Sequence, residues 1–555
     1  RTVRIPLASQ GGGARRACVA AATAALLVRS SRVAGFPSRQ PFPPLRESVM
    51  RSCRYLSIIA RLRLLPVVAV LFLFASGVGA SSTRPGGIFP PDNDPLPIAY
   101  KQSLFAGFTE DRVGTAVSIS GGLLAVGVPG NDTGQTFDTG RVDVYRWLDE
   151  AAGWVLFTSY TTQSFGITQT ANARFGAAVS ISRDWLLIGC PGCIAADDTK
   201  AILVRVPEVI EGANQPLGGL EAYRLSPPSL GDFNDPVDGT GAAVALNVVT
   251  AGTILNPTTS VAFAVGSPAA TFGNFTLGAV AMGNLVPGVS GVDWEFGPTY
   301  GTADFGKYGA SLAMSAATWI DTGIFRNERD LVVGQPGWVP NGGSGIPGQA
   351  SLWKRVSGSW SLFQNFEAPS PGFLDALGSA VASERISNDS LGTIALGAPG
   401  RSLNGTPGGS VIVFRQAVVD GTYQFDQEFQ HPEAETADRF GGALALSNNR
   451  LLVGADGRAV DLNNNAGSVY VYRYELNQLF NYSWVRKQTL IEPRESGGNS
   501  AFGFSVAIGP RAAAIGAPLS DAAGLSNAGR VATYLCDRIF ADGLEGNASN
   551  ACSGP

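Results

Sequence analysis

Residue types that usually carry catalysis are scarce in this chain, and its single histidine is the clearest example. His431 lies in the segment His431-Pro432-Glu433, and a Ser-His-Asp mechanism would need a nucleophile beside it. The sequence contains no G-x-S-x-G elbow, no P-loop, no HExxH motif and no GxGxxG loop between a strand and a helix. We therefore predict that His431 is a surface loop residue and that the protein is not an enzyme.

The cysteines indicate structural disulfide bonds. Two of the six fall in an N-terminal leader, and the four in the body of the chain are an even number that suits an oxidising compartment. Local pairing, Cys190 with Cys193 and Cys536 with Cys552, is the simplest of three connectivities. Cys190-Pro-Gly-Cys193 could instead be a redox or metal-binding CxxC motif, although neither a second CxxC nor a flanking βαβ pattern accompanies it.

An internal repeat supplies the elements that must position any site, and the sequence contains seven copies of it. Each copy opens with a Gly before alternating small and apolar residues. An apolar strand ending in Gly-x-Pro, or a close variant, follows, and then a Gly/Ala-x-Val strand. The opening glycines lie 62, 65, 65, 72, 63 and 62 residues apart. The repeats are numbered one to seven in the order of their opening glycines, which are Gly114, Gly176, Gly241, Gly306, Gly378, Gly441 and Gly503.

Alternation with a period of two predicts β-strands throughout the repeats, as in Val469-Tyr470-Val471-Tyr472. Three strands are clear in each copy, and several copies have a fourth that is marked by a Trp. Seven sets of four antiparallel strands predict an all-β fold, a seven-bladed β-propeller over residues 98–535, in which no long sheet edge is left unprotected.

The two ends of the repeat region are predicted to meet in one blade. Repeat seven has its third strand at residues 529–534 and lacks a fourth. Residues 101–104 (Lys-Gln-Ser-Leu) resemble the fourth-strand segment 487–490 (Lys-Gln-Thr-Leu) of repeat six. We therefore expect the N-terminal strand to complete the last blade.

The Phe-Gly and Gly-Ala-Pro pairs of the repeats are the signature of FG-GAP repeats, as in Phe440-Gly441 and Gly397-Ala398-Pro399. The chain resembles secreted FG-GAP repeat proteins, akin to the seven-bladed propeller of integrin α subunits, over about residues 98–535. This resemblance implies extracellular recognition and adhesion, often with bound calcium.

Calcium in integrin-like blades lies between the first and second strands, on a D-x-[DN]-x-[DN]-G-type run. Most of those connections are too short here, whereas repeats three and four are expected to have longer ones, with Asp321 and Asp330 in repeat four. The nearest match to the motif lies elsewhere, in repeat six. It is Asp461-x-Asn463-x-Asn465, with Ala466 in place of Gly. These three residues are candidate Ca²⁺ ligands, and the alternative is a solvated turn rich in Asp and Asn.

The N-terminal region is predicted to be a leader. Residues 1–49 form an over-extended or disordered N-terminus, and residues 50–80 form a signal peptide with a 12-residue apolar run at residues 64–75. A linker spans 81–97, and a short C-terminal tail spans 536–555. We therefore expect a secreted protein, extracellular or periplasmic or cell-surface if bacterial, without a transmembrane segment in the mature chain.

Charge is divided unequally between the leader and the body. The chain has 40 Lys and Arg residues and 44 Asp and Glu residues, of which residues 1–80 hold 12 basic residues and one acidic residue. Residues 81–555 therefore have 28 basic and 43 acidic residues, a formal charge of −15. An acidic body argues against nucleic acid as a partner, because phosphate binding requires clustered basic residues.

Loops on a rigid scaffold are where binding residues usually lie. The second-to-third and fourth-to-first strand connections share one face of a propeller, and the longer segments collect there, so we call it the long-loop face. We predict that this face binds an extracellular protein or glycan. The candidate ligand-binding residues are Asp132, Phe137, Asp198, Phe272, Trp338, Asp461 and Asp521. Three alternatives stay open. One is that these side chains cover neighbouring blades or are simply solvated. The second is an extracellular hydrolase or lyase with paired carboxylates at the channel mouth, and the third is a structural surface protein that calcium stabilises.

Overall fold

The computed structural model describes residues 98–536, all of which belong to the second of two units of the chain, Asp94–Pro555. The described part of the second unit has gaps at residues 106, 194–198, 208–219, 228–238, 273–274, 286–290, 301–305, 341–344, 357, 386–390, 403–404, 419, 432, 434, 461–464, 477–480 and 494–498. The predicted leader, signal peptide, linker and most of the tail lie outside the described residues. Within the described part, no helix is long and apolar enough to cross a membrane.

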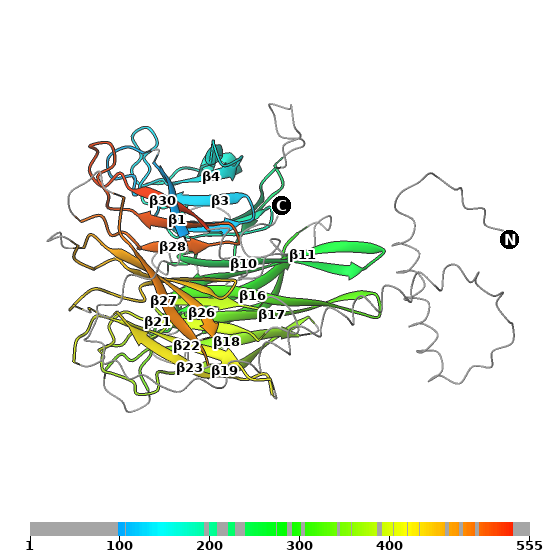
Figure 1. The fold of residues 1–555 in the computed structure, drawn as a ribbon. Helices are drawn as coiled ribbons and strands as arrows, with labels where there is room; N and C mark the ends of the chain where they lie inside the picture. The colour runs from blue at the N-terminus through cyan, green and yellow to red at the C-terminus, as the bar shows by residue number, and fades with distance from the viewer. Residues whose placement is uncertain are drawn as a thin grey trace, which may run out of the picture. The chain divides into compact units, whose positions relative to one another are not determined.

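The described residues form an all-β structure built mostly of four-stranded antiparallel sheets (Figure 1). Repeat one forms β2 (Ala116–Ser120), β3 (Leu123–Val128), β4 (Arg141–Trp147) and β5 (Trp154–Tyr160), followed by the 3-10 helix η1 (Thr162–Phe165). Repeat two forms β6 (Val179–Ser182), β7 (Trp185–Gly189), β8 (Ala201–Arg205) and β9 (Ala222–Leu225).

Repeats five and six have the same order of strands. Repeat five forms β20 (Ala380–Glu384), β21 (Thr393–Ala398), β22 (Ser410–Gln416) and β23 (Tyr423–Gln430). Repeat six forms β24 (Ala443–Ser447), β25 (Arg450–Ala455), β26 (Ser468–Leu476) and β27 (Tyr482–Leu490). In each sheet the strands neighbour one another in chain order.

The last sheet combines the two ends of the described chain. Repeat seven supplies β28 (Ser505–Ile508), β29 (Ala512–Ala517) and β30 (Arg530–Cys536), and the fourth strand is β1 (Ile98–Leu104). β1 pairs antiparallel with β30 from Ile98 opposite Cys536 to Leu104 opposite Val531. The N-terminal strand thus takes the place that repeat seven leaves open.

Repeats three and four join into one eight-stranded sheet. Repeat three supplies β10 (Ala243–Thr253), β11 (Asn256–Ser267), β14 (Ala279–Leu285) and β15 (Asp293–Tyr300), and the hairpin of β12 (Thr271–Phe272) with β13 (Phe275–Thr276) lies apart. Repeat four supplies β16 (Ser311–Asp321), β17 (Ile324–Gln335), β18 (Gln349–Val356) and β19 (Ser359–Phe366). The link between the two repeats is the pairing of Thr253 with Ile324.

The prediction of longer connections between the first and second strands of repeats three and four is wrong, because the strands themselves are long. Only residues 254–255 separate β10 from β11, and only 322–323 separate β16 from β17. We call these the paired hairpins, and Figure 1 shows both extending beyond the neighbouring strands. Asp321 therefore ends a strand, and Asp330 is buried within β17.

Apolar side chains of neighbouring sheets form the core between them. Ala125 and Val144 of the first sheet pack in one cluster with Leu186 and Ile202 of the second. Val117 and Val126 of the first sheet pack in the same way with Ala514 and Val531 of the last sheet. The first strand of each repeat lies beside the first strand of the next, and β28 lies beside β2.

The signature glycines hold each repeat against its neighbour. The amide of the opening Gly donates a hydrogen bond to the carbonyl of the Gly-x-Pro glycine in the same repeat, as from Gly114 to Gly127 at 3.1 Å. The Gly127 Cα faces the carbonyl of Gly176 in the next repeat, and a Cβ there would approach that oxygen to well under 3.0 Å. The equivalent contact joins Gly516 of repeat seven to Gly114 of repeat one. Only glycine fits these crossing points.

This pattern corrects the opening glycine of repeat four from Gly306 to Gly309. Gly309 donates to the Gly334 carbonyl at 3.0 Å, as the other opening glycines do to theirs, and Tyr308 forms the bridge to Gly278. The spacings on either side become 68 and 69 residues in place of 65 and 72. Repeat four thus opens with Tyr-Gly instead of Phe-Gly.

Candidate functional site

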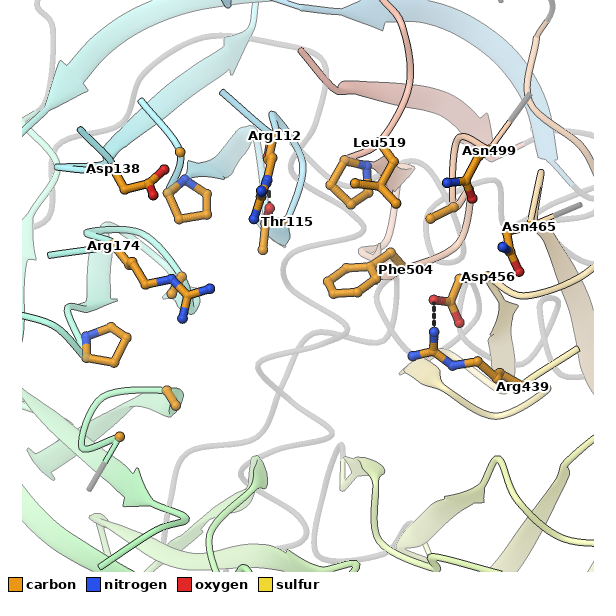
Figure 2. Close-up of a pocket in the computed structure, with 18 residues that line it drawn as sticks. Arg112, Thr115, Asp138, Arg174, Arg439, Asp456, Asn465, Asn499, Phe504 and Leu519 are labelled. Carbon is orange, nitrogen blue, oxygen red and sulfur yellow. Dashed lines mark hydrogen bonds and ion pairs between the residues drawn. The ribbon is translucent and has the colours of Figure 1, made fainter. Parts of the chain in front are cut away.

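A cavity of about 550 Å³ lies on the long-loop face. Its lining comes from the loops that follow the second strands and from those that lead into the first strands, in repeats one, two, three, six and seven. We call this cavity the mouth. Its charged and amide-bearing lining residues are Arg112, Asp138, Arg174, Arg439, Asp456, Asn465 and Asn499 (Figure 2). Phe504, Leu519 and prolines 129, 191 and 518 provide apolar surface.

Three arginines reach the mouth from one repeated backbone position, the residue two before the opening Gly. Arg112, Arg174 and Arg439 all have φ between 54° and 59°, the left-handed region. The Arg174 amide donates to the Asp138 carbonyl of the preceding repeat at 2.9 Å, and the Arg174 carbonyl accepts from the Ala177 amide at 3.0 Å. These two bonds hold the turn that leads into β6, and its geometry fixes the left-handed conformation.

The same position in the other repeats carries small residues or lysine. The residues are Gly239, Lys307, Ala376 and Ala501, all with positive φ. A left-handed conformation costs a residue with a Cβ roughly 1–2 kcal/mol, so glycine or asparagine would suit the backbone better. Four basic residues and no acidic residue at seven such positions are therefore not explained by backbone geometry.

The charges in the mouth are only partly compensated. Arg439 forms an ion pair with Asp456 at 3.0 Å (Figure 2). Burial raises the pKa of Asp456, and the Arg439 guanidinium opposes that rise. Arg112 is 3.6 Å from Glu110, with both side chains about half exposed, so water and salt screen this pair. Among the described residues, the Arg174 guanidinium has neither an ion-pair nor a hydrogen-bond partner.

Two of the predicted ligand-binding aspartates stabilise the loops in which they lie. Asp132 accepts a hydrogen bond at Oδ1 from the Asp138 amide at 2.8 Å, and Asp521 accepts one from the Asn527 amide at 3.0 Å. Both bonds span six residues in equivalent loops after the second strands of repeats one and seven. The geometry of these bonds gives Asp132 and Asp521 a structural role.

The predicted aromatic anchors do not line the mouth. Phe137 and Phe272 are 68% and 57% exposed, and Phe272 lies opposite Phe275 in the β12–β13 hairpin. Trp338 is half-buried in the loop after β17. Among the described candidates, only Asn465 belongs to the lining of the mouth. Asp198 and Asp461 lie outside the described residues.

The calcium prediction stays a prediction. Asp461 and Asn463 lie outside the described residues, and Asn465 is exposed with a φ of 53°. Its carbonyl accepts a hydrogen bond from the Ala501 amide at 2.9 Å, which ties the loop to repeat seven. Within the described ranges, no three His, Cys, Asp or Glu side chains are grouped to hold a metal ion.

One predicted disulfide is present beside the mouth. Cys190 and Cys193 are bonded to each other, are buried, and have their Cα atoms 5.4 Å apart. The bond closes the turn after β7, and Pro191 in this turn lines the mouth. Cys536 ends β30, and its predicted partner Cys552 lies outside the described residues.

The predicted surface location of His431 is wrong. Its side chain is buried, with the ring 4.5 Å from the ring of Tyr470. Its Nδ1 accepts a hydrogen bond from the Glu433 amide at 2.9 Å. Burial, together with the neighbouring Arg458 guanidinium, lowers the pKa of His431 to about 4. A neutral imidazole that uses its acceptor on the backbone has a structural role here.

Sequence reasoning missed the arginines of the mouth as functional candidates. Their signal is present in the repeat alignment, because Arg112, Arg174 and Arg439 stand directly before the Val-Gly or Phe-Gly pair. Glycine or asparagine is the usual residue for a left-handed position. The sequence alone does not show that this position is left-handed, so the recurrent arginine becomes unusual only when the turn conformation is known.

Comparison with known proteins identifies one segment of the chain. The FG-GAP repeat model matches residues 426–472, which run from β23 into β26. No curated protein sequence matches the chain. Two solved structures are similar to the chain. The Saccharomyces cerevisiae protein Sqt1 has 9% identity and a TM-score of 0.35, and the match covers 76% of this chain and 84% of that one. The Pseudomonas aeruginosa periplasmic gluconolactonase PpgL has 12% identity and a TM-score of 0.38, and the match covers 68% of this chain and 85% of that one. The chain contains an FG-GAP repeat at residues 426–472, within a described part that is all-β.

Proposed function

We propose that the chain forms a closed seven-bladed β-propeller of FG-GAP repeats, similar to the propeller of integrin α subunits. Two observations support closure. The first strands of the seven repeats contact one another in order, and the cycle returns from β28 to β2. The crossing of glycines between neighbouring repeats likewise ends with Gly516 against Gly114.

The propeller acts outside the cell as a recognition or adhesion module, and the long-loop face binds a protein or glycan. The mouth carries this proposal, because five repeats contribute to a single cavity of about 550 Å³. Ligand sites commonly have volumes of about 300–1,000 Å³ and combine apolar walls with a few polar groups. The mouth has this composition, with Phe504, Leu519 and three prolines beside the arginines.

Recognition without catalysis fits the carboxylates of the mouth better than hydrolysis does. Asp138 and Asp456 are the acidic residues in its described lining. A glycosidase needs one carboxyl group as acid and a second as base or nucleophile. Asp456 is paired with Arg439, which leaves Asp138 as the one other carboxylate in the described lining, where two free carboxyl groups would be needed. Release of new reducing ends from a bound oligosaccharide would favour the hydrolase instead.

Binding of the full chain to arrays of glycans and extracellular-matrix proteins tests the proposal. We expect captured ligands to bind a Phe504→Ala/Leu519→Ala double variant at least about tenfold more weakly, because both side chains line the mouth. Phe425→Ala is the matched control, since Phe425 is 52% exposed on the outer strand β23.

Two outcomes would overturn this assignment. One is the absence of any captured ligand across both arrays. The other is loss of binding in a variant of the paired hairpins, Leu255→Ser, with normal binding in the mouth variant. Leu255 is 97% exposed at the turn between β10 and β11, so this substitution changes the surface and leaves the core intact.

A further inference from the structure

We infer that the mouth selects anionic glycans, oligosaccharides that carry carboxylate or sulfate groups. This inference rests on the proposed function of the long-loop face and specifies its ligand class. It starts from the basic residues at the repeated left-handed position: Arg112, Arg174, Lys307 and Arg439. The turn fixes the left-handed backbone at this position but gives no reason for a basic side chain there, and residues that persist in a strained conformation are signs of a functional requirement.

The charge of the three arginines that line the mouth is available to a ligand. Arg174 is exposed at the mouth and has no charged partner among the described residues, and the Arg112 pair with Glu110 is long and exposed. Arg439 is 56% exposed even though it contacts Asp456. Guanidinium groups bind carboxylate and sulfate oxygens through two parallel hydrogen bonds, which suits this ligand class.

The surrounding protein has the opposite charge. Residues 81–555 carry a formal charge of −15, whereas the described lining of the mouth has three arginines and two aspartates. The described lining thus has a net charge of +1 (three arginines less two aspartates) on a chain that is otherwise acidic, so the arginines are the part of the surface to which an anionic group is attracted. Electrostatic contrast of this kind orients a charged ligand more than it adds affinity.

The apolar part of the mouth favours a sugar over a simple inorganic ion. Phe504 is 41% exposed and lines the cavity with Leu519. In Figure 2, Phe504 lies across the opening from Arg174, with Arg112 and Arg439 on other sides. The face of an aromatic ring attracts the C–H groups of a sugar ring, and arginines from three repeats can bind anionic groups on different sugars of one chain.

Titration calorimetry with the full chain tests the ligand class. The probes are a heparin hexasaccharide with sulfate and carboxylate groups, an oligogalacturonate hexamer with carboxylates only, neutral maltohexaose and a hexaglutamate peptide. We expect one or both anionic sugars to bind, more weakly as salt increases, and maltohexaose and hexaglutamate to bind at least about tenfold more weakly. The two anionic sugars distinguish sulfate from carboxylate recognition.

Arg174→Gly and Arg112→Gly then test the site. Each should weaken binding of the anionic sugar about tenfold or more, because a charge-assisted hydrogen-bond pair is lost. Glycine already occupies this backbone position at Gly239, and it removes the left-handed strain, so the melting temperature should not fall. Arg326→Gln is the matched control. It removes the same charge from a half-exposed arginine of the paired hairpins and should change binding less than about twofold.

Three results would overturn the inference, and they separate it from the proposed function. Normal binding of the anionic sugars by both glycine variants, or an equal loss in Arg326→Gln, removes the arginine site. Preference for hexaglutamate replaces the glycan with an acidic peptide. If Phe504→Ala/Leu519→Ala abolishes binding of a neutral array ligand while the glycine variants bind it normally, the ligand class is wrong and the proposed function stands.

Discussion

The sheets differ at their two ends in the connections between strands. At one end, loops of ten or more residues surround the mouth and hold arginines in left-handed turns. At the other end, most first and second strands are joined by two residues, and the paired hairpins expose Ile254, Leu255 and Ile320. Left-handed residues occur at both ends, with Arg183, Thr322 and Asn448 in the short turns. Loop length and the repeated basic position, rather than backbone strain alone, therefore distinguish the end that we propose for binding.

The largest expected effect comes from the glycines that support the mouth end. In Gly516→Ala the new methyl group would lie against the Gly114 carbonyl, where the backbone of two repeats crosses. We expect a loss of about 3 kcal/mol or more in unfolding free energy, measured by chemical denaturation. The control is Gly122→Ala in the opposite turn, where the nearest atom is the Trp147 Cβ at 3.9 Å. An equal, small effect of both substitutions would contradict the role of the crossing.

A pH-dependent effect is expected beneath the mouth end, at His431. Its pKa is lowered to about 4 in the folded chain, against an ordinary value of about 6.5. The unfolded chain therefore binds a proton that the folded chain rejects, and stability falls as the pH drops from about 6.5 towards 4. Between pH 7 and pH 4.5 the wild type should lose about 2 kcal/mol more than His431→Asn, which keeps an acceptor for the Glu433 amide. Parallel stability profiles for the two proteins would exclude this buried, neutral histidine.

A smaller change is expected in Arg174→Gly. Glycine relieves the left-handed strain, so we expect the unfolding free energy to stay the same or to rise by up to about 1 kcal/mol. Ala501→Gly makes the same backbone change without removing a charge, because Ala501 has a φ of 52° at the equivalent position. If Arg174→Gly is instead destabilised by more than about 1 kcal/mol while Ala501→Gly is not, the arginine side chain has a structural role.

The smallest effect is expected at the paired hairpins. Leu255 is 97% exposed, so Leu255→Ser should change the unfolding free energy by no more than about 0.5 kcal/mol. Leu124→Ala provides the scale, because Leu124 is fully buried in β3 and its truncation should cost about 3 kcal/mol. A large effect at Leu255 would indicate that the turn is covered in solution.

The strands could be predicted because their cause is local. Alternating apolar residues and the recurring glycines placed most strands of repeats one, two, five, six and seven. The paired hairpins were missed because Gly252 and Pro257 look like turn residues, and they lie opposite each other inside the hairpin of β10 and β11. The opening of repeat four was misplaced because Asp304-Phe305-Gly306 imitates the Phe-Gly signature three residues early.

The candidate site was harder to predict because its parts are distant in the chain. Residue type and loop position predict Asp132 and Phe137 as binding residues, but side-chain direction depends on the turn that holds them. Arg112, Arg174 and Arg439 are brought together only by the packing of whole repeats. His431 is predicted at the surface because no catalytic partner is visible in the sequence, whereas the rings of Phe440 and Tyr470 from repeat six pack against it.

Hydrogen–deuterium exchange of the full chain tests the central claim most directly, measured with and without whichever of the two anionic hexasaccharides binds more tightly in calorimetry. If the mouth is the ligand site, exchange should slow at residues 129–140, 172–177 and 437–442, and it should stay unchanged at 253–257 and 321–325 in the paired hairpins. Slowed exchange confined to the paired hairpins, or no change anywhere in the chain, would contradict the assignment of the mouth as the binding site.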